Sequence, residues 1–107
     1  MSDAIIVMVT CPTDEEADRI AARLIEGKLA ACVNIAGRLR SLFHWKGAVA
    51  RETEFLLIIK THKNRFDALE RVVKEMHSYE TPEVISTPIT MGSGGYLAWI
   101  GESTGCG

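Results

Sequence analysis

Phe55-Leu56-Leu57-Ile58-Ile59 is the most informative segment for the fold of this 107-residue chain. Five consecutive apolar residues are typical of a buried strand. Because side chains alternate between the two faces of a strand, the run places apolar groups on both faces. We therefore expect a strand near the middle of a sheet whose two faces are both covered.

The residues before this run predict its partner strand. No helical period occurs over residues 30–45, and Lys46-Gly47 is typical of a hairpin turn that leads into residues 49–61. Gly37 marks an expected bulge or bend. An extended segment of that length reaches roughly 50 Å at ~3.3 Å per residue, whereas a domain of this size has a radius of gyration near ~13 Å. The hairpin should therefore overhang its own domain and leave backbone edges that need a partner.

The elements on either side alternate between strand and helix. Residues 4–10 read as a buried strand, and Thr13 with Glu16 has the spacing of a capping box at the start of a helix that Gly27 ends. Residues 66–76 carry a second apolar stripe at helical spacing, residues 84–89 read as a strand, and residues 96–101 as a short C-terminal helix.

This order, β-α-β-β-α-β, predicts an α+β, ferredoxin-like sandwich with two helices on one face of a four-stranded antiparallel sheet. An extended central β-hairpin and a short C-terminal helix are added to it. Helices can cover only one face of such a sheet, so we expect another copy of the chain to bury the other. We expect one domain over residues 1–107, with residues 103–107 as a flexible tail.

Composition excludes several classes of protein. Apolar residues make up 47% and charged residues 24% of the chain, the net charge is −2, and no Lys/Arg block offers a surface for nucleic acid or anionic lipid. The first residues lack a basic region, and the apolar run at 4–9 is too short for a signal peptide or a membrane span. Three widely spaced cysteines predict free thiols and no structural zinc site. We expect a cytoplasmic protein.

The segment from His77 to Glu83 carries the most functional chemistry. It reads His-Ser-Tyr-Glu-Thr-Pro-Glu and joins a helix to a strand, which is where binding residues often lie. A rigid proline turn with solvated carboxylates is the alternative interpretation, and the sequence leaves both open.

Several motifs, in order, resemble those of the CutA family, the divalent-cation-tolerance proteins. The similarity extends over almost the whole chain. The matching segments are Ala30-Ala31-Cys32-Val33-Asn34-Ile35, Trp45-Lys46-Gly47, Glu54 with Lys60-Thr61, the segment 77–83, Pro88-Ile89 and Tyr96-Leu97-Ala98-Trp99-Ile100. Ser78 stands where the family usually has proline. The resemblance implies a ferredoxin-like fold assembled as a homotrimer through extended strands, a link to copper and other divalent cations, and no established reaction. It also implies a likeness to the PII signalling proteins.

The metal site proposed for bacterial relatives fits this chain in part. It uses a first-strand cysteine and two adjacent histidines, and these positions correspond to Val9, Met76 and His77 here. We therefore keep His77 as a candidate ligand, with Cys11 as a weaker second, for copper or another divalent cation. Met76 is better explained by core packing.

A second hypothesis is a pocket between subunits that binds a small anionic or amphipathic molecule, as in a PII-like regulatory trimer. Lys60 at the end of a buried strand needs a carboxylate, and aromatic side chains could form apolar walls. The candidate residues, besides His77, are Trp45, Glu54, Lys60, Tyr79, Glu80 and Glu83. An interface salt bridge at Lys60 is the alternative.

Catalysis has little support in the sequence. No Ser-His-Asp or Cys-His spacing indicates nucleophilic chemistry, and the glycines at 92–95 lack the lysine of a phosphate loop. Cys32 reads as a small core residue, Cys106 as part of the tail, and His44 and His62 as surface or satisfied polar groups. We expect a non-enzymatic protein.

Overall fold

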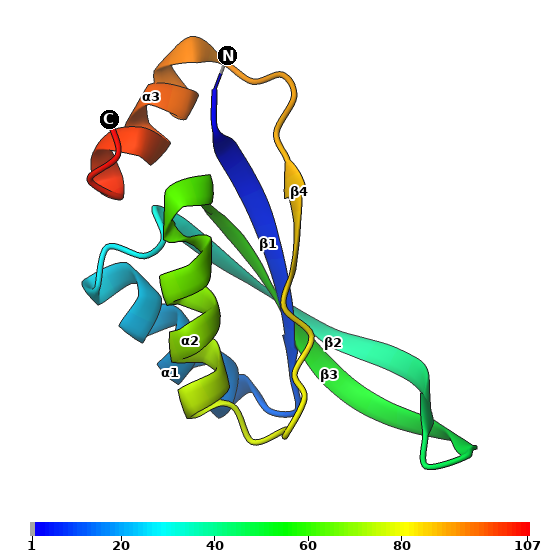
Figure 1. The fold of residues 1–107 in the computed structure, drawn as a ribbon. Helices are drawn as coiled ribbons and strands as arrows, with labels where there is room; N and C mark the ends of the chain where they lie inside the picture. The colour runs from blue at the N-terminus through cyan, green and yellow to red at the C-terminus, as the bar shows by residue number, and fades with distance from the viewer. Residues whose placement is uncertain (1) are drawn as a thin grey trace.

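The computed structural model describes residues 2–107 and confirms the ferredoxin-like α+β fold (Figure 1). The four strands form one antiparallel sheet in the order β2-β3-β1-β4. The elements are β1 (Ala4–Cys11), α1 (Asp14–Glu26), β2 (Cys32–Trp45), β3 (Ala48–His62), a 3-10 turn (Lys63–Arg65), α2 (Phe66–Met76), β4 (Ile85–Pro88) and α3 (Gly94–Ser103).

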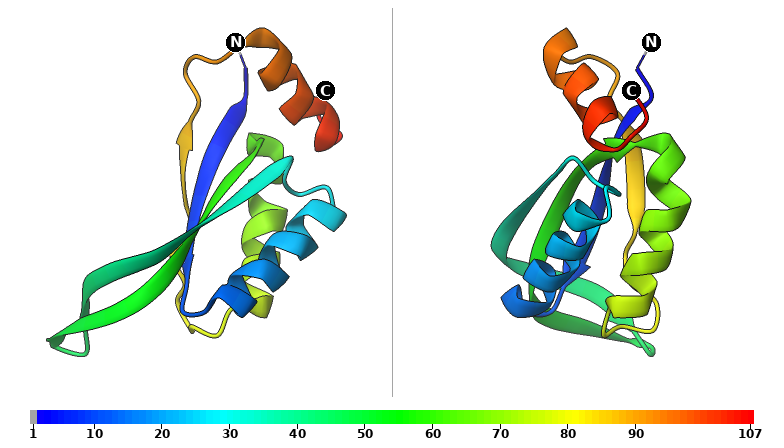
Figure 2. Two further views of the ribbon diagram at one scale, coloured as in Figure 1. Left: turned by 180° about the vertical axis from the view of Figure 1, so that it is seen from behind. Right: turned by 90° about the vertical axis from the view of Figure 1, so that its left-hand side faces the viewer.

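The helices all lie on one side of the sheet, as both views in Figure 2 show. The buried side chains of β1 and β3 that face them alternate along each strand, as a sheet with one covered face requires. They pack against the apolar stripes of α1 and α2. The core comprises Ile5, Val7, Val9, Cys11, Ala17, Ile20, Ala21, Leu24, Ala30, Leu57, Ile59, Leu69 and Val73.

The opposite face of the sheet has no covering element within residues 2–107. Met8 on β1 lies beside Ile58 on β3 and Ile85 on β4, and Leu56 lies beside Thr10. Ile85 is 52% exposed, and Met8, Leu56 and Ile58 are half-buried. Apolar side chains therefore reach solvent on this face.

The β2–β3 hairpin extends well beyond the helical layer (Figures 1 and 2), as its length predicted. The chain measures 44 × 25 × 22 Å, with a radius of gyration of 14.3 Å. Lys46 and Gly47 form the turn, both with positive φ (49° and 80°), which is the backbone of a type I′ hairpin. The expected irregularity at Gly37 is a shift of register between Ala36 and Leu39.

The ends of the elements differ from the prediction in three places. Strand β4 covers only Ile85–Pro88, and α3 begins two residues earlier than expected. Residues 103–107 were expected to form a flexible tail, but they fold back on α3. Thr104 is fully buried there, and its carbonyl accepts a hydrogen bond from Arg65 Nε at 2.9 Å. No helix within residues 2–107 is both long and apolar enough to cross a membrane.

Candidate functional site

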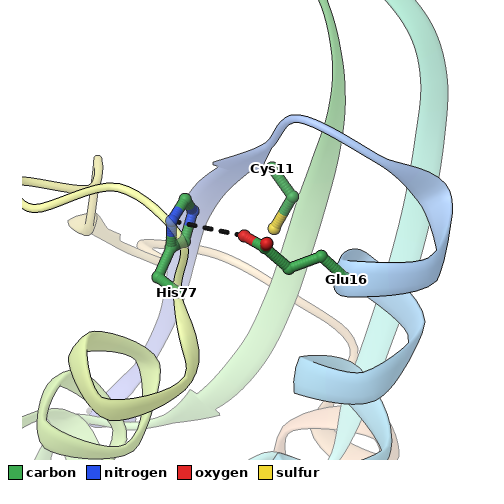
Figure 3. Close-up of side chains that lie close together, drawn as sticks. All are labelled: Cys11, Glu16 and His77. Carbon is green, nitrogen blue, oxygen red and sulfur yellow. Dashed lines mark ion pairs between the residues drawn. The ribbon is translucent and has the colours of Figure 1, made fainter.

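Three elements bring Cys11, Glu16 and His77 together beneath the end of the sheet (Figure 3). Cys11 is the last residue of β1, Glu16 lies in the first turn of α1, and His77 caps the C-terminus of α2. One donor atom from each side chain lies within 4.8 Å of the other two, and all three residues are buried. The cluster therefore joins the two helices to the sheet.

The hydrogen bonds of His77 fix its tautomer. Its Nε2 lies 2.7 Å from the carbonyl oxygen of Thr10, which can only accept, so Nε2 carries the hydrogen. Nδ1 accepts the backbone N–H of Tyr79 at 3.0 Å. Nδ1 is therefore the ring nitrogen with a lone pair, and a carbonyl behind Nε2 is the usual support of a metal-binding histidine.

Glu16 places its carboxylate beside the same nitrogen. Oε2 lies 3.3 Å from His77 Nδ1 and accepts the backbone N–H of Ser78 at 3.2 Å. The capping box predicted for α1 is therefore only half formed. The Thr13 hydroxyl accepts the N–H of Glu16 at 3.1 Å, but the Glu16 side chain turns to the loop after α2.

Cys11 is held as a neutral thiol. Burial first, and then the charges of Glu16 and Glu54, raise its pKa to about 12. Because the thiolate is the nucleophile, this cysteine is poorly suited to covalent catalysis. A metal ion could still bind the sulfur, provided that it displaced the proton.

These donors fit a divalent metal ion chemically. Thiol sulfur, imidazole nitrogen and carboxylate oxygen are the ligands that Zn²⁺ and related ions take in proteins. Nδ1 and Oε2 are both acceptors 3.3 Å apart, an arrangement that a cation between them would stabilise. His77 and Cys11, predicted as ligands, are thus brought together, and Glu16 joins them. Val9 is fully buried and Met76 packs against the core.

A groove beside this cluster collects five of the six other predicted site residues. It has a volume of about 1040 Å³ and lies between the overhanging hairpin and the loop after α2. Trp45, Glu54, Tyr79, Glu80 and Glu83 all line it. These five side chains therefore meet within one chain, while a pocket between subunits stays a prediction.

Hydrogen bonding and charge give this groove an acidic character. The hydroxyl of Tyr79 donates to Glu54 Oε2 at 3.0 Å, and Glu54 is only 5% exposed. Burial, and then this hydrogen bond, raise the pKa of the Tyr79 phenol, while burial and the charge of Glu54 raise the pKa of Glu83. Glu52 adds a fourth carboxylate, whereas Arg40 is the single Lys or Arg in the lining formed by the described residues.

Lys60 does not lie with the other predicted pocket residues. It sits six positions after Glu54 on β3, opposite Cys32, and donates to the Asn34 side chain. None of the three carboxylates expected to pair with it does so within residues 2–107. Lys60 could reach a pocket of this kind only from a neighbouring copy.

The remaining candidates have local roles. His62 accepts the backbone N–H of Asn64 at 3.1 Å, and His44 is exposed on β2, where it lines the groove. Cys32 is only half-buried, so its expected place in the core is wrong. Cys106 lies 3.6 Å from the carbonyl of Thr104, within the folded C-terminus.

Glu16 is the cluster residue that the sequence analysis missed. Its distance from Thr13 in the sequence indicates helix capping. A second signal was present: Glu16, Ile20 and Leu24 are spaced by four residues, so the carboxylate belongs to the stripe that faces the core. A carboxylate on a buried stripe needs a partner, and the backbone N–H of Ser78 provides it.

Known proteins resemble the chain closely in sequence and in fold. Residues 5–103 match the family described as CutA1 divalent ion tolerance protein. The divalent-cation tolerance protein CutA of Thermus thermophilus is 43% identical over 100 residues, which are 94% of this chain and 97% of that protein. A CutA homolog from Xenopus laevis is 48% identical over 94 residues, which are 88% of this chain but only 62% of the relative.

The fold agrees with these matches. The solved structure of the periplasmic divalent cation tolerance protein CutA from Archaeoglobus fulgidus superposes with a TM-score of 0.91 at 44% identity, over 94% of this chain and 98% of that one. Identity at this level over nearly the whole domain exceeds what a shared fold alone would give. The chain therefore belongs to the CutA1 family of divalent ion tolerance proteins.

Proposed function

We propose that this chain is a cytoplasmic, trimeric protein that binds copper or another divalent ion and contributes to divalent-cation tolerance without catalysing a reaction. The meeting of His77 and Cys11 in one buried cluster is the observation that carries the metal part of the proposal. The names of the relatives support the role in tolerance. The neutral, buried thiol argues against nucleophilic catalysis.

Isothermal titration with Cu²⁺ tests the metal part. We expect wild-type protein to bind more tightly than millimolar, and His77→Ala to lose most of that affinity. His62→Ala is the matched control, because that histidine lies outside both the cluster and the groove. Millimolar or absent binding that His77→Ala leaves unchanged would count decisively against metal binding.

Assembly is proposed from the uncovered face of the sheet. Half-buried Met8, Leu56 and Ile58, with exposed Ile85, form an apolar surface that a second copy would remove from water. Sedimentation equilibrium should give three times the chain mass of 11.8 kDa, and Ile58→Lys should reduce it. A stable, folded species of single-chain mass would refute the trimer.

Cytoplasmic residence rests on the three free thiols, and cell fractionation would test it.

A PII-like regulatory trimer that binds a small metabolite is the second candidate. The groove favours it, because five predicted pocket residues meet there. The carboxylates in the groove lining favour a cationic over an anionic ligand. A thermal-shift screen discriminates between the candidates: stabilisation by a metabolite and not by metal, lost in Tyr79→Phe, supports the regulatory hypothesis.

A further inference from the structure

We propose that Glu16 is the third protein ligand of the metal site, which makes the site selective for a divalent ion of the zinc and copper(II) class over Cu(I). The inference rests on the metal binding proposed above and adds the donor set, the class of ion and a consequence for the groove. It follows from three properties of the cluster: charge, distance and the hydrogen bonds that an ion would replace.

Charge is the first property. The side chains of His77 and Glu16 are 0% and 7% exposed, and Cys11 is fully buried. With the thiol deprotonated, a thiolate, a carboxylate and a neutral imidazole carry two negative charges. A divalent ion cancels both, whereas Cu⁺ would leave one uncompensated charge in a buried place, which is costly. Binding releases one proton, from the Cys11 sulfur to solvent.

Distance is the second property. Bonds of about 2.0–2.3 Å to a tetrahedral Zn²⁺ place its ligand atoms roughly 3.3–3.8 Å from one another. His77 Nδ1 and Glu16 Oε2 are already 3.3 Å apart. Every pair in the cluster is within 4.8 Å, so no pair needs to close by more than about 1 Å to reach that geometry. Side-chain adjustment within the cluster can supply this.

Hydrogen bonding is the third property. Nδ1 of His77 has one lone pair, which the N–H of Tyr79 now occupies, and Oε2 of Glu16 accepts the N–H of Ser78. Coordination through Nδ1 must release the Tyr79 amide, and coordination through Oε2 weakens the bond from Ser78. Ser78 and Tyr79 both line the groove, where the Tyr79 hydroxyl also donates a hydrogen bond to Glu54. An ion in the cluster therefore reshapes the groove wall, and by linkage a groove ligand changes the affinity for the ion.

Zinc titration of the full chain, followed by calorimetry and by amide NMR, tests this proposal. Glu16→Gln keeps an oxygen that can accept the Ser78 N–H but removes the charge, and we expect it to lower Zn²⁺ affinity by at least roughly tenfold. Glu15→Gln is the matched control, because that carboxylate is exposed on the same turn. Saturation with Zn²⁺ should shift the amide resonances of Ser78 and Tyr79. With Co²⁺, the sulfur-to-cobalt charge-transfer band should disappear in Cys11→Ser.

The outcomes separate the two proposals. Unchanged Zn²⁺ affinity in Glu16→Gln, with loss in His77→Ala, overturns the role of Glu16 and leaves the metal proposal standing. No binding of Zn²⁺ or Cu²⁺ by the wild-type chain overturns the metal proposal itself. Cu(I) affinity that falls in parallel in Glu16→Gln overturns the assignment to divalent ions. If Glu16→Gln does not fold, Glu16→Asp, which keeps the charge on a shorter arm, should show the same loss, and wild-type affinity there would refute the proposal.

Discussion

Replacing Ser78 by the proline that is usual in the family should destabilise this chain, and the reason lies in Glu16. Proline has no N–H, so Ser78→Pro removes the hydrogen bond at 3.2 Å to Glu16 Oε2. The carboxylate is buried, with 7% of its side chain exposed, and cannot replace this donor with bulk water. The serine and the glutamate are therefore expected to act as a pair.

The size of the effect follows from two opposing terms. A hydrogen bond to a charged group contributes about 1.5–3 kcal/mol to stability. A proline that fits the native backbone stabilises the protein by about 0.4–1 kcal/mol, because it lowers the conformational entropy of the unfolded chain. The net loss should be roughly 0.5–2.5 kcal/mol. At about 4–8 °C per kcal/mol for a domain near this size, Ser78→Pro should lower Tm measurably.

A double-mutant cycle isolates the pair. Urea unfolding of wild type, Ser78→Pro, Glu16→Ala and the double variant, all at one protein concentration, gives the coupling free energy. Strain from the proline ring would appear in both backgrounds and cancel. We expect a coupling of about 1.5–3 kcal/mol. A value near zero, with Ser78→Pro equally harmful whether or not the Glu16 carboxylate is present, would show that the two residues do not act as a pair.

Three further predictions concern the hairpin and the ionisable groups. Gly37→Ala should cost about 1–3 kcal/mol in urea unfolding, because its Cβ would overlap the Phe55 ring, whereas Gly94→Ala, with open space around it, should cost much less. The thiol of Cys11 has a pKa of about 12 in the folded chain and near 9 in the unfolded chain. The free energy of unfolding should therefore fall as pH rises from 9 to 12, and this pH dependence should be absent in Cys11→Ala. In an ultraviolet titration Tyr79 should ionise above the usual pKa range of a phenol, and Tyr79→Phe should remove that late step.

The fold was predictable because its signals are local and repeat along the chain. The apolar run from Phe55 to Ile59, the Lys46-Gly47 turn and the stripe of α2 each set one element, and together they allowed one topology. The boundaries were less predictable. Ile25 belongs by spacing to the stripe of α1, yet it is 42% exposed, because it lies in the last turn, at the edge of the packed layer.

The site was only half predictable, because its contacts join residues far apart in sequence. His77 and Cys11 could be named from their chemistry. Glu16, the third residue of the cluster, could not, because its distance from Thr13 in the sequence indicates only helix capping. Lys60 shows the limit of reasoning from charge alone. Its charge suggests a carboxylate partner, whereas within the chain the neighbouring strand supplies the amide of Asn34, and a carboxylate from another subunit stays a prediction.

Strand β3 is continuous from Ala48, at the tip of the hairpin, to the fully buried Thr61 near its other end. One strand therefore has an exposed end in the hairpin and a buried end in the core, and its amide protons can report on both. Hydrogen exchange near Leu57 and Ile59 should report the opening of the whole domain, whereas exchange near the exposed Val49, which pairs with His44, should report local opening of the hairpin. Global and local opening could then be measured in the same experiment.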